Sequence, residues 1–292
     1  MSRRGRDLDT LSIPALLRTV NREDRRVAPA VGRVIPRIAA AVQVVVEALS
    51  HGGRLIYVGA GTSGRLALLD ALELPPTFGV SPDTVQAVVA GGLASTVEAT
   101  SPLEDDTELG RREMQRLGVG APDVVVGVTA SGSTPFTLAA MREARRRGAR
   151  TIGVTTTAGS PLVHASDIVI VPEVGEEVLR GSTRMKAGTA QKLALNMLST
   201  AAMVRLGHVY RDLMVDVRPL NEKLRRRAQD LVATVTRLPA AQAQALLDAA
   251  GGEAKVALVM GLAQVDAEGA RRLLQESAGF VRLAVGRARR RR

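Results

Sequence analysis

Apolar residues recur at helical spacing before residue 52 and form short continuous runs after it. Residues 9–51 carry apolar side chains three and four positions apart, which predicts helices. Pro29 and Pro36 should break or kink them, because proline lacks the N–H of an interior helix bond. Five later runs are rich in Val and Ile without polar alternation, which predicts strands covered on both faces. They are 54–58, 84–90, 123–129, 150–155 and 167–171.

Helix-like segments separate these strands, at 63–74, about 103–117 and 134–147. The alternation predicts an α/β domain of three layers around a parallel sheet, with ligands bound at the carboxyl ends of the strands. A long helix over 183–207 is apolar around most of its circumference, so we expect it to be buried, with a subunit interface as one setting.

The C-terminal part reads as a small helical domain. Its helical segments are 220–236, 239–250, 252–263 and 266–276. The predicted boundaries are therefore 1–218 for the α/β domain with its N-terminal helical segment, and 219–292 for the helical domain with a basic tail.

Composition narrows the chemistry. Aromatic residues make up only 2 % of the chain and cysteine is absent, which excludes disulfides and thiolate metal sites. The three histidines match no metal-ligand spacing, so we predict no metal site. No apolar run resembles a secretory signal or is long enough to span a bilayer, so we expect a cytoplasmic protein without membrane contact.

The net charge of +11 invites a nucleic-acid interpretation, but its location does not favour one. Nine arginines lie within residues 1–6 and 282–292, which leaves 11 − 9 = +2 for the rest. Such tails are more often solvated and disordered than specific binders, so we expect no specific nucleic-acid partner.

A glycine turn follows the first strand, with the sequence GAGTSG at 59–64. Free N–H groups and the helix dipole favour an anion there, beside the hydroxyls of Thr62 and Ser63 and the backbone of Gly64. The spacing also matches a dinucleotide fingerprint, but no acidic residue ends the second strand, which disfavours NAD.

A second turn with hydroxyl side chains follows the third strand. The third strand ends in Ser131, Gly132, Ser133 and Thr134 just before a helix, which offers a second anion site, although a plain helix cap explains it as well. Together the two turns favour a phosphorylated small molecule.

Ser182 and Thr183 open the long helix, and Arg184 and Lys186 stand in its first turn. Cations there oppose the dipole and need an anionic partner. Either Glu176 or Glu177, or the ligand itself, could supply it.

Two carboxylates are candidates for acid–base chemistry. Pro75 and Pro76 predict that the helix ends by Leu74, which places Glu73 in its last turn on an apolar face. Such a setting suits a general acid, and a solvent-facing Glu73 is the alternative. Glu104 stands near the start of the next helix, on the same rim as the turns, where dipole stabilisation alone also explains acids.

The residues resemble the N-acetylmuramic acid 6-phosphate etherase family, built on the sugar isomerase (SIS) domain. The resemblance rests on GRLIYVGAGTSGRL, ELPPTFG, VVGVTASGSTPF, LMVDV and, most specifically, GSTRMKAGTAQKLALNMLSTAAMVRLG. It implies a flavodoxin-like SIS fold and a homodimer. It also implies a carbon–oxygen lyase of the hydro-lyase type that uses no metal or organic cofactor.

The family's reaction cleaves the lactyl ether of N-acetylmuramic acid 6-phosphate by elimination and hydration, and yields N-acetylglucosamine 6-phosphate and D-lactate in cell-wall sugar recycling. The resemblance implies that Glu73 and Glu104 are catalytic, and we assign Glu73 as the acid and Glu104 as the base. Ligand contacts are expected from the residues of the turns: Thr62, Ser63, Gly64, Ser131, Gly132, Ser133, Thr134, Glu177, Ser182, Thr183 and Lys186.

One departure matters, because Ser133 stands where the family usually has arginine. Substrate preference or turnover should therefore differ from the family pattern. Two alternatives stay open: a non-catalytic sugar-phosphate-binding regulator, since a glucokinase regulatory protein shares these motifs, and an aldose–ketose phosphate isomerase.

Overall fold

The computed structural model describes residues 7–92, 102–216 and 222–291, so the predicted N-terminal tail lies outside the described residues. Contacts divide the chain into two interleaved units. Unit 1 comprises residues 1–44, 55–69 and 87–198, and unit 2 comprises 45–54, 70–86 and 199–292. The predicted boundary at 218 stays a prediction.

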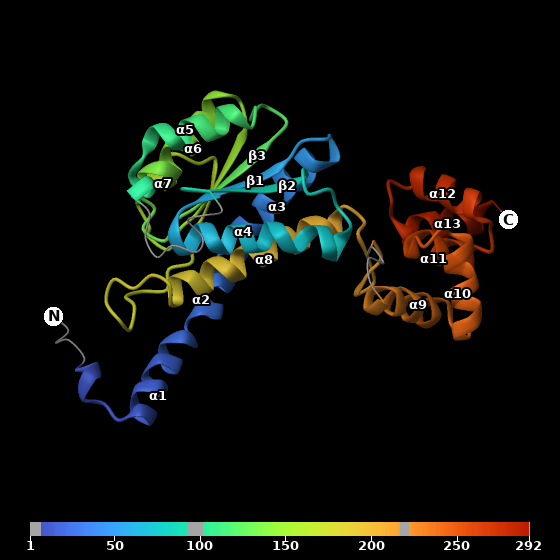
Figure 1. The fold of residues 1–292 in the computed structure, drawn as a ribbon, viewed down its shortest axis with the longest axis horizontal. Coiled ribbons are helices and arrows are strands. Elements are labelled where there is room, and N and C mark those ends of the chain that lie inside the picture. The colour runs from blue at the N-terminus through green and yellow to red at the C-terminus, as the bar shows by residue number, and fades with distance from the viewer. Residues whose placement is uncertain (1–6, 93–101, 217–221, 292) are drawn as a thin grey trace. The chain divides into compact units, whose positions relative to one another are not determined.

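A five-stranded sheet in the order β2-β1-β3-β4-β5 forms the centre of the α/β part (Figure 1). The pairs β1–β3, β3–β4 and β4–β5 are parallel, with Val58 opposite Gly127. The strands are β1 (Leu55–Gly59), β2 (Val85–Val89), β3 (Val124–Val128), β4 (Arg150–Val154) and β5 (Ile168–Ile170). This confirms the predicted sheet, and the strand order reverses at β1, so ligands should bind beyond the ends of β1 and β3.

One face of the sheet is covered by α5 (Thr107–Arg116), α6 (Pro135–Arg146) and the short α7 (Pro161–His164), as Figure 1 shows. The core between them includes Ile56, Val125 and Phe136, all fully buried. A methyl group on Gly127 would lie 2.7 Å from Met141 Sδ, so the glycine allows α6 to pack directly on β3.

Three helices precede the sheet: α1 (Ile13–Asp24), α2 (Val27–Arg33) and α3 (Ile35–Ser50). The predicted helical segment is thus confirmed. Pro29 and Pro36 lie inside the first turns of α2 and α3, where a missing N–H breaks no helix bond.

Helix α4 (Gly61–Phe78) corrects the prediction that Pro75 and Pro76 end the helix. The prolines remove only the bonds to the carbonyls of residues 71 and 72, and their fixed φ suits a helix. The last turn still closes, because Gly79 N donates to Pro75 O at 3.0 Å and Gly79 has φ +70°. Glu73 is therefore five residues before the helix end, not in its last turn.

The long helix α8 (Lys186–Arg205) confirms the predicted element but begins three residues later than predicted, so Ser182, Thr183 and Arg184 precede it. Its burial is uneven. Leu195 and Leu198 are fully buried, whereas Met197 and Val204 are 40 % and 41 % exposed in the single chain. The chain alone therefore buries only part of this helix, and burial of the rest in a subunit interface stays a prediction.

The C-terminal helices share one core, which includes Val232, Leu258 and Ala284. Ahead of them, the hairpin of β6 (Val209–Tyr210) and β7 (Leu213–Met214) leads to Asp216, whose Oδ2 accepts from Lys255 Nζ at 2.6 Å. The helices are α9 (Glu222–Thr236), α10 (Ala240–Ala249), α11 (Ala254–Ala263), α12 (Ala267–Gln275) and α13 (Val281–Arg290).

Helix α13 corrects the prediction of a disordered basic tail. Val281, Ala284, Val285 and Ala288 are buried and recur at i, i+3, i+4 and i+7. The arginines occupy its outer face and last turn, where cations stabilise the helix dipole.

Candidate functional site

The glycine turn joins β1 to α4. Gly61 has φ +53°, and a methyl group on Gly64 would lie 2.8 Å from Gly59 O, so no larger side chain fits. Ser63 is buried and Thr62 half-buried beside the first N–H groups of α4, which have no partners within the helix. The predicted turn and helix start are therefore present, and anion binding at them stays a prediction.

Glu104 lies against this turn. It belongs to the short helix η3 (Pro102–Asp105), and its Oε2 is 3.7 Å from a methyl group placed on Gly61. Its neighbour Asp106 is occupied otherwise, since its carboxylate caps α5 by accepting from Leu109 N at 2.9 Å. Of these two acids, Glu104 is the one that faces the turn, as predicted from its place on the rim.

The second turn follows β3, and Ser131 is its centre. Ser131 Oγ lies 3.0 Å from Ser133 Oγ and accepts from Ser133 N at 3.2 Å, while Thr134 Oγ1 lies 2.8 Å from Thr129 Oγ1. Thr134 makes no side-chain cap of α6, and Gly132 has φ +67°. The hydroxyls are thus linked to one another, as a polar platform rather than a helix cap.

The start of α8 differs from the prediction. The Glu177 carboxylate caps this helix, accepting from Lys186 N at 3.1 Å and Ala187 N at 2.9 Å. A carboxylate therefore already fills the position that an anionic ligand would take at this helix end.

Lys186 also has internal partners. Its Nζ donates to Glu23 Oε2 at 2.9 Å, to Val174 O at 3.0 Å and to Glu176 O at 2.6 Å. An ammonium group has three N–H donors, and all three are used. The geometry therefore favours a structural role for Lys186 over ligand contact, and its acidic partner is Glu23 on α1 instead of the expected Glu176 or Glu177 side chains.

Helix α8 supports the glycine turn from behind. A methyl group on Gly188 would lie 3.6 Å from Thr62 Cγ2, and Ser63 Oγ donates to Gln191 Oε1 at 3.0 Å. Sequence reasoning missed Gln191. The available signal was a polar residue between the buried positions Ala190 and Ala194 of an apolar helix.

Glu73 lies on the exposed surface of α4 within unit 2, whereas Glu104 belongs to unit 1. The apolar side chains near it, Leu69 and Leu72, are 42 % and 61 % exposed, so its surroundings are not buried within the single chain. Glu73 has an interaction within the protein. Its pairing with Glu104 across a ligand stays a prediction.

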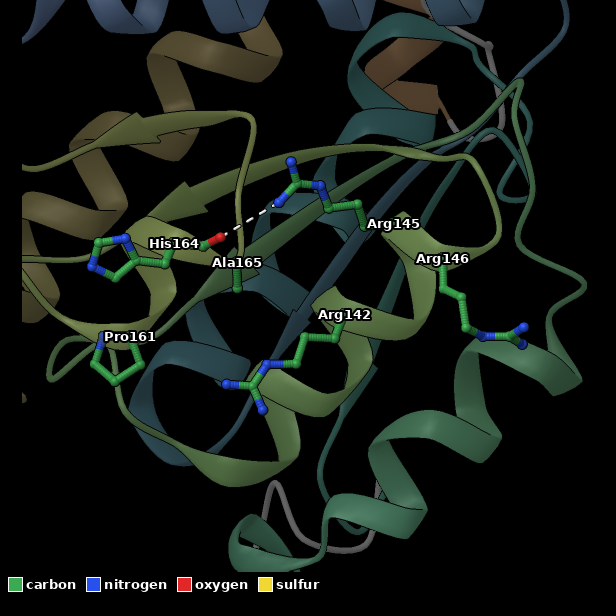
Figure 2. A pocket seen from close by; sticks show the side chains of 6 residues that line it. All are labelled: Arg142, Arg145, Arg146, Pro161, His164 and Ala165. Carbon is green, nitrogen blue, oxygen red and sulfur yellow. Dashed lines mark hydrogen bonds between the residues drawn. The ribbon is translucent and has the colours of Figure 1, made fainter.

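A different hollow, of about 350 Å³, lies on the flank of α6 (Figure 2). Its lining residues include Arg142, Arg145, Arg146 and His164. Arg145 donates to the His164 carbonyl oxygen at 3.4 Å, and in Figure 2 the Arg146 side chain points away from His164. In the described ranges, no group of three metal-ligating side chains occurs, and no single helix is long and apolar enough to cross a bilayer.

Known proteins match this chain over nearly its whole length. The chain is 52 % identical over 284 residues to the N-acetylmuramic acid 6-phosphate etherase of Rubrobacter xylanophilus, covering 97 % of this chain and 94 % of the relative. It is 48 % identical to the protein of that name from Aeromonas hydrophila, with 94 % and 92 % covered. The chain belongs to the N-acetylmuramic acid 6-phosphate etherase family.

Further matches agree with membership of the etherase family. The model of the SIS domain matches residues 103–201, and that of the glucokinase regulatory protein N-terminal SIS domain matches 37–145. Among solved structures, a putative phosphosugar isomerase from Bacteroides fragilis aligns with TM-score 0.51 at 20 % identity, covering 68 % of this chain and 94 % of that one. At this identity the structural likeness supports the SIS fold alone, as predicted.

Proposed function

We propose that this protein cleaves the D-lactyl ether of N-acetylmuramic acid 6-phosphate, giving N-acetylglucosamine 6-phosphate and D-lactate by elimination followed by hydration. The observation that carries the proposal is the position of Glu104, whose carboxylate lies against the glycine turn that offers an anion site. An acid–base group and an anion site are thus adjacent, as a reaction on a sugar phosphate requires.

The two turns would hold the substrate. N–H groups at the start of α4 and the hydroxyls around Ser131 can donate hydrogen bonds to phosphate oxygens. All of these donors are uncharged groups. Because Lys186 and Glu177 are engaged within the protein, we expect the contacts from this region to come from Ser182 and Thr183.

The chemistry needs a base and an acid. Opening the sugar to its aldehyde makes the C2 proton acidic, and we assign Glu104 to remove it. The C3–O bond then breaks as a C2=C3 alkene forms, and Glu73 is assigned to donate a proton to the departing lactate oxygen. Water adds to the alkene at C3, with C2 regaining a proton, which classifies the enzyme as a carbon–oxygen lyase of the hydro-lyase type.

The test measures D-lactate released from N-acetylmuramic acid 6-phosphate by the purified protein. Glu104→Gln and Glu73→Gln should each lower the rate by about 10²–10⁴-fold, the usual contribution of a general acid or base. Glu108→Gln is a matched control, because Glu108 lies four positions after Glu104, at the start of α5, and is bound to Arg111 and Arg112 on the surface. It should retain activity.

The roles are separated by hydrogen exchange in D₂O. With Glu73→Gln, a base at Glu104 can still exchange the C2 hydrogen of the substrate although lactate is retained. With Glu104→Gln, both exchange and lactate release should stop. The opposite pattern would reverse the assignment of acid and base.

Other outcomes favour the alternatives. Tight binding of hexose 6-phosphates without lactate release indicates a regulator, and interconversion of aldose and ketose phosphates indicates an isomerase. We also propose a homodimer, because Met197 and Val204 are exposed on α8 in the single chain. A monomer in light scattering would contradict it.

A further inference from the structure

Gln191 contacts the glycine turn through a buried amide that is only half satisfied. The residue is 1 % exposed, and its Oε1 accepts from Ser63 Oγ at 3.0 Å. Its Nε2 has no hydrogen-bond partner among the residues that the structure describes. Among the described contacts the amide is held by the Ser63 hydrogen bond alone, so a half-turn of the amide would break no other hydrogen bond.

A second arrangement follows from the symmetry of the amide. A half-turn of the carboxamide exchanges its oxygen and nitrogen at nearly the same positions. Nε2 then donates to a lone pair of Ser63 Oγ, and Oε1 takes the position that Nε2 had. The Ser63–Gln191 hydrogen bond is kept, but its direction is reversed.

Reversal changes what Ser63 can offer to a ligand. A hydroxyl has a single proton, so while Ser63 donates to Gln191 it presents only lone pairs, which repel an anionic oxygen. When Nε2 donates instead, the proton of Ser63 is free to bond a phosphate oxygen. We infer that Gln191 is a positioning residue that donates to Ser63 in the ligand-bound state and so makes Ser63 a donor to the sugar phosphate.

The neighbouring cation cannot replace this function. Lys186, on the same helix, has all three N–H groups engaged with Glu23, Val174 and Glu176. Lys186 therefore supplies no charge to an anion at this turn, where the direction of the Ser63 proton decides whether Ser63 donates or accepts. The inference rests on the proposed function, because it takes a sugar phosphate as the ligand.

Three variants test the inference by the KM for N-acetylmuramic acid 6-phosphate. Gln191→Met keeps the length but removes the amide that directs the Ser63 proton, and should raise KM about fivefold with a smaller change in kcat, as expected for one lost hydrogen bond between neutral groups. Gln191→Glu can only accept when ionised, and should raise KM further. As the pH falls and the introduced carboxyl is protonated, the ratio of its KM to that of the wild type at the same pH should shrink.

The control for coupling is Ser63→Ala. In that background Gln191→Met should have no further effect on KM, because the two residues act through one hydrogen bond. Gln115→Met, on the exposed surface of α5, is the matched control and should leave KM unchanged. Equal effects of Gln191→Met with and without Ser63, or an unchanged KM, would overturn the inference.

Failure of the proposed function is recognised separately. If the wild type releases no lactate, the same variants are compared by calorimetric binding of glucose 6-phosphate. Weaker binding by Gln191→Met that disappears in the Ser63→Ala background keeps the inference for a sugar-phosphate binder. Binding that is the same in all variants rejects it.

Discussion

Unit 1 contains one ion pair that is buried under the start of α8 and, in contrast, ion pairs on the outer face of α5 and α6. The Lys186 and Glu23 side chains are 1 % and 7 % exposed, and two backbone carbonyls complete the bonding of Lys186. On the outer face, Arg116 and Arg146 are 64 % and 67 % exposed. Each pair joins a cation to a carboxylate, but of these pairs only Lys186–Glu23 has both partners shielded from water.

The carboxylates of the outer face differ from each other in burial. Glu143 is 4 % exposed although its partner Arg146 is mostly in solvent, whereas Glu113 is 23 % exposed. Because the penalty for an unpaired charge depends on how little water reaches it, the three pairs should differ in energy in the order of their burial.

Lys186→Met should give the largest effect. Removal of the ammonium takes its 2.9 Å contact from the buried Glu23 carboxylate, and breaking a buried pair costs about 3–5 kcal/mol. The free energy of unfolding from urea denaturation checks the value. Activity should fall as well, since α8 supports Thr62 and Ser63.

The double variant Glu23→Leu with Lys186→Met sharpens this result. Because neither residue then leaves a buried, unpaired charge, the double variant should be more stable than Lys186→Met alone, by more than about 1 kcal/mol. If the effects of the two changes on the free energy of unfolding are additive, the buried pair has no coupling energy. The predicted difference between the buried pair and the surface pairs is then contradicted.

Glu143→Gln should give an intermediate effect, about 1 kcal/mol at neutral pH after allowance for the solvent around Arg146. The pH dependence is more specific. The hydrogen bond from Arg146 lowers the pKa of Glu143 from 4.5 to about 2, against the opposing effect of burial.

Since the folded pKa lies below the ordinary value, this stabilisation is complete above pH 4.5 and is lost as the pH falls toward 2. The stability difference between wild type and Glu143→Gln should therefore narrow over that range in urea titrations. A difference that stays constant from pH 6 to pH 3 would show that the contact acts through packing instead of charge.

Features that depend on local sequence pattern could be predicted, whereas side-chain contacts between distant segments could not. The strands, the glycine turn and the second hydroxyl turn follow from runs of Val and Ile that end in small polar residues. The partner of Lys186 could not be predicted in this way, because Glu23 lies 163 positions away and no local sequence pattern links the two residues.

Two other predictions, the end of α4 and the disordered C-terminal tail, were wrong although the sequence contained a local signal for the observed structure. Pro75 and Pro76 were read as a helix end, but α4 continues for its last turn because the prolines remove only two bonds. In α13, the run of arginines masked the apolar spacing from Val281 to Ala288. At the site, Gln191 was missed because a lone polar residue in an apolar helix does not reveal which turn it will face.

Arg116→Gln should have the smallest effect of the series. Arg116 bonds Glu113 one turn away at 2.7 Å, and water can replace either partner, so the expected loss is below about 0.5 kcal/mol. At 1 M NaCl the residual difference from wild type should vanish, because the charges are screened within about 3 Å. A loss as large as that of Glu143→Gln, or one insensitive to salt, would mean that burial of the carboxylate does not set the energy of these pairs. The same protocol applied to Lys186→Met should show little salt dependence, since screening ions do not reach a side chain that is 1 % exposed.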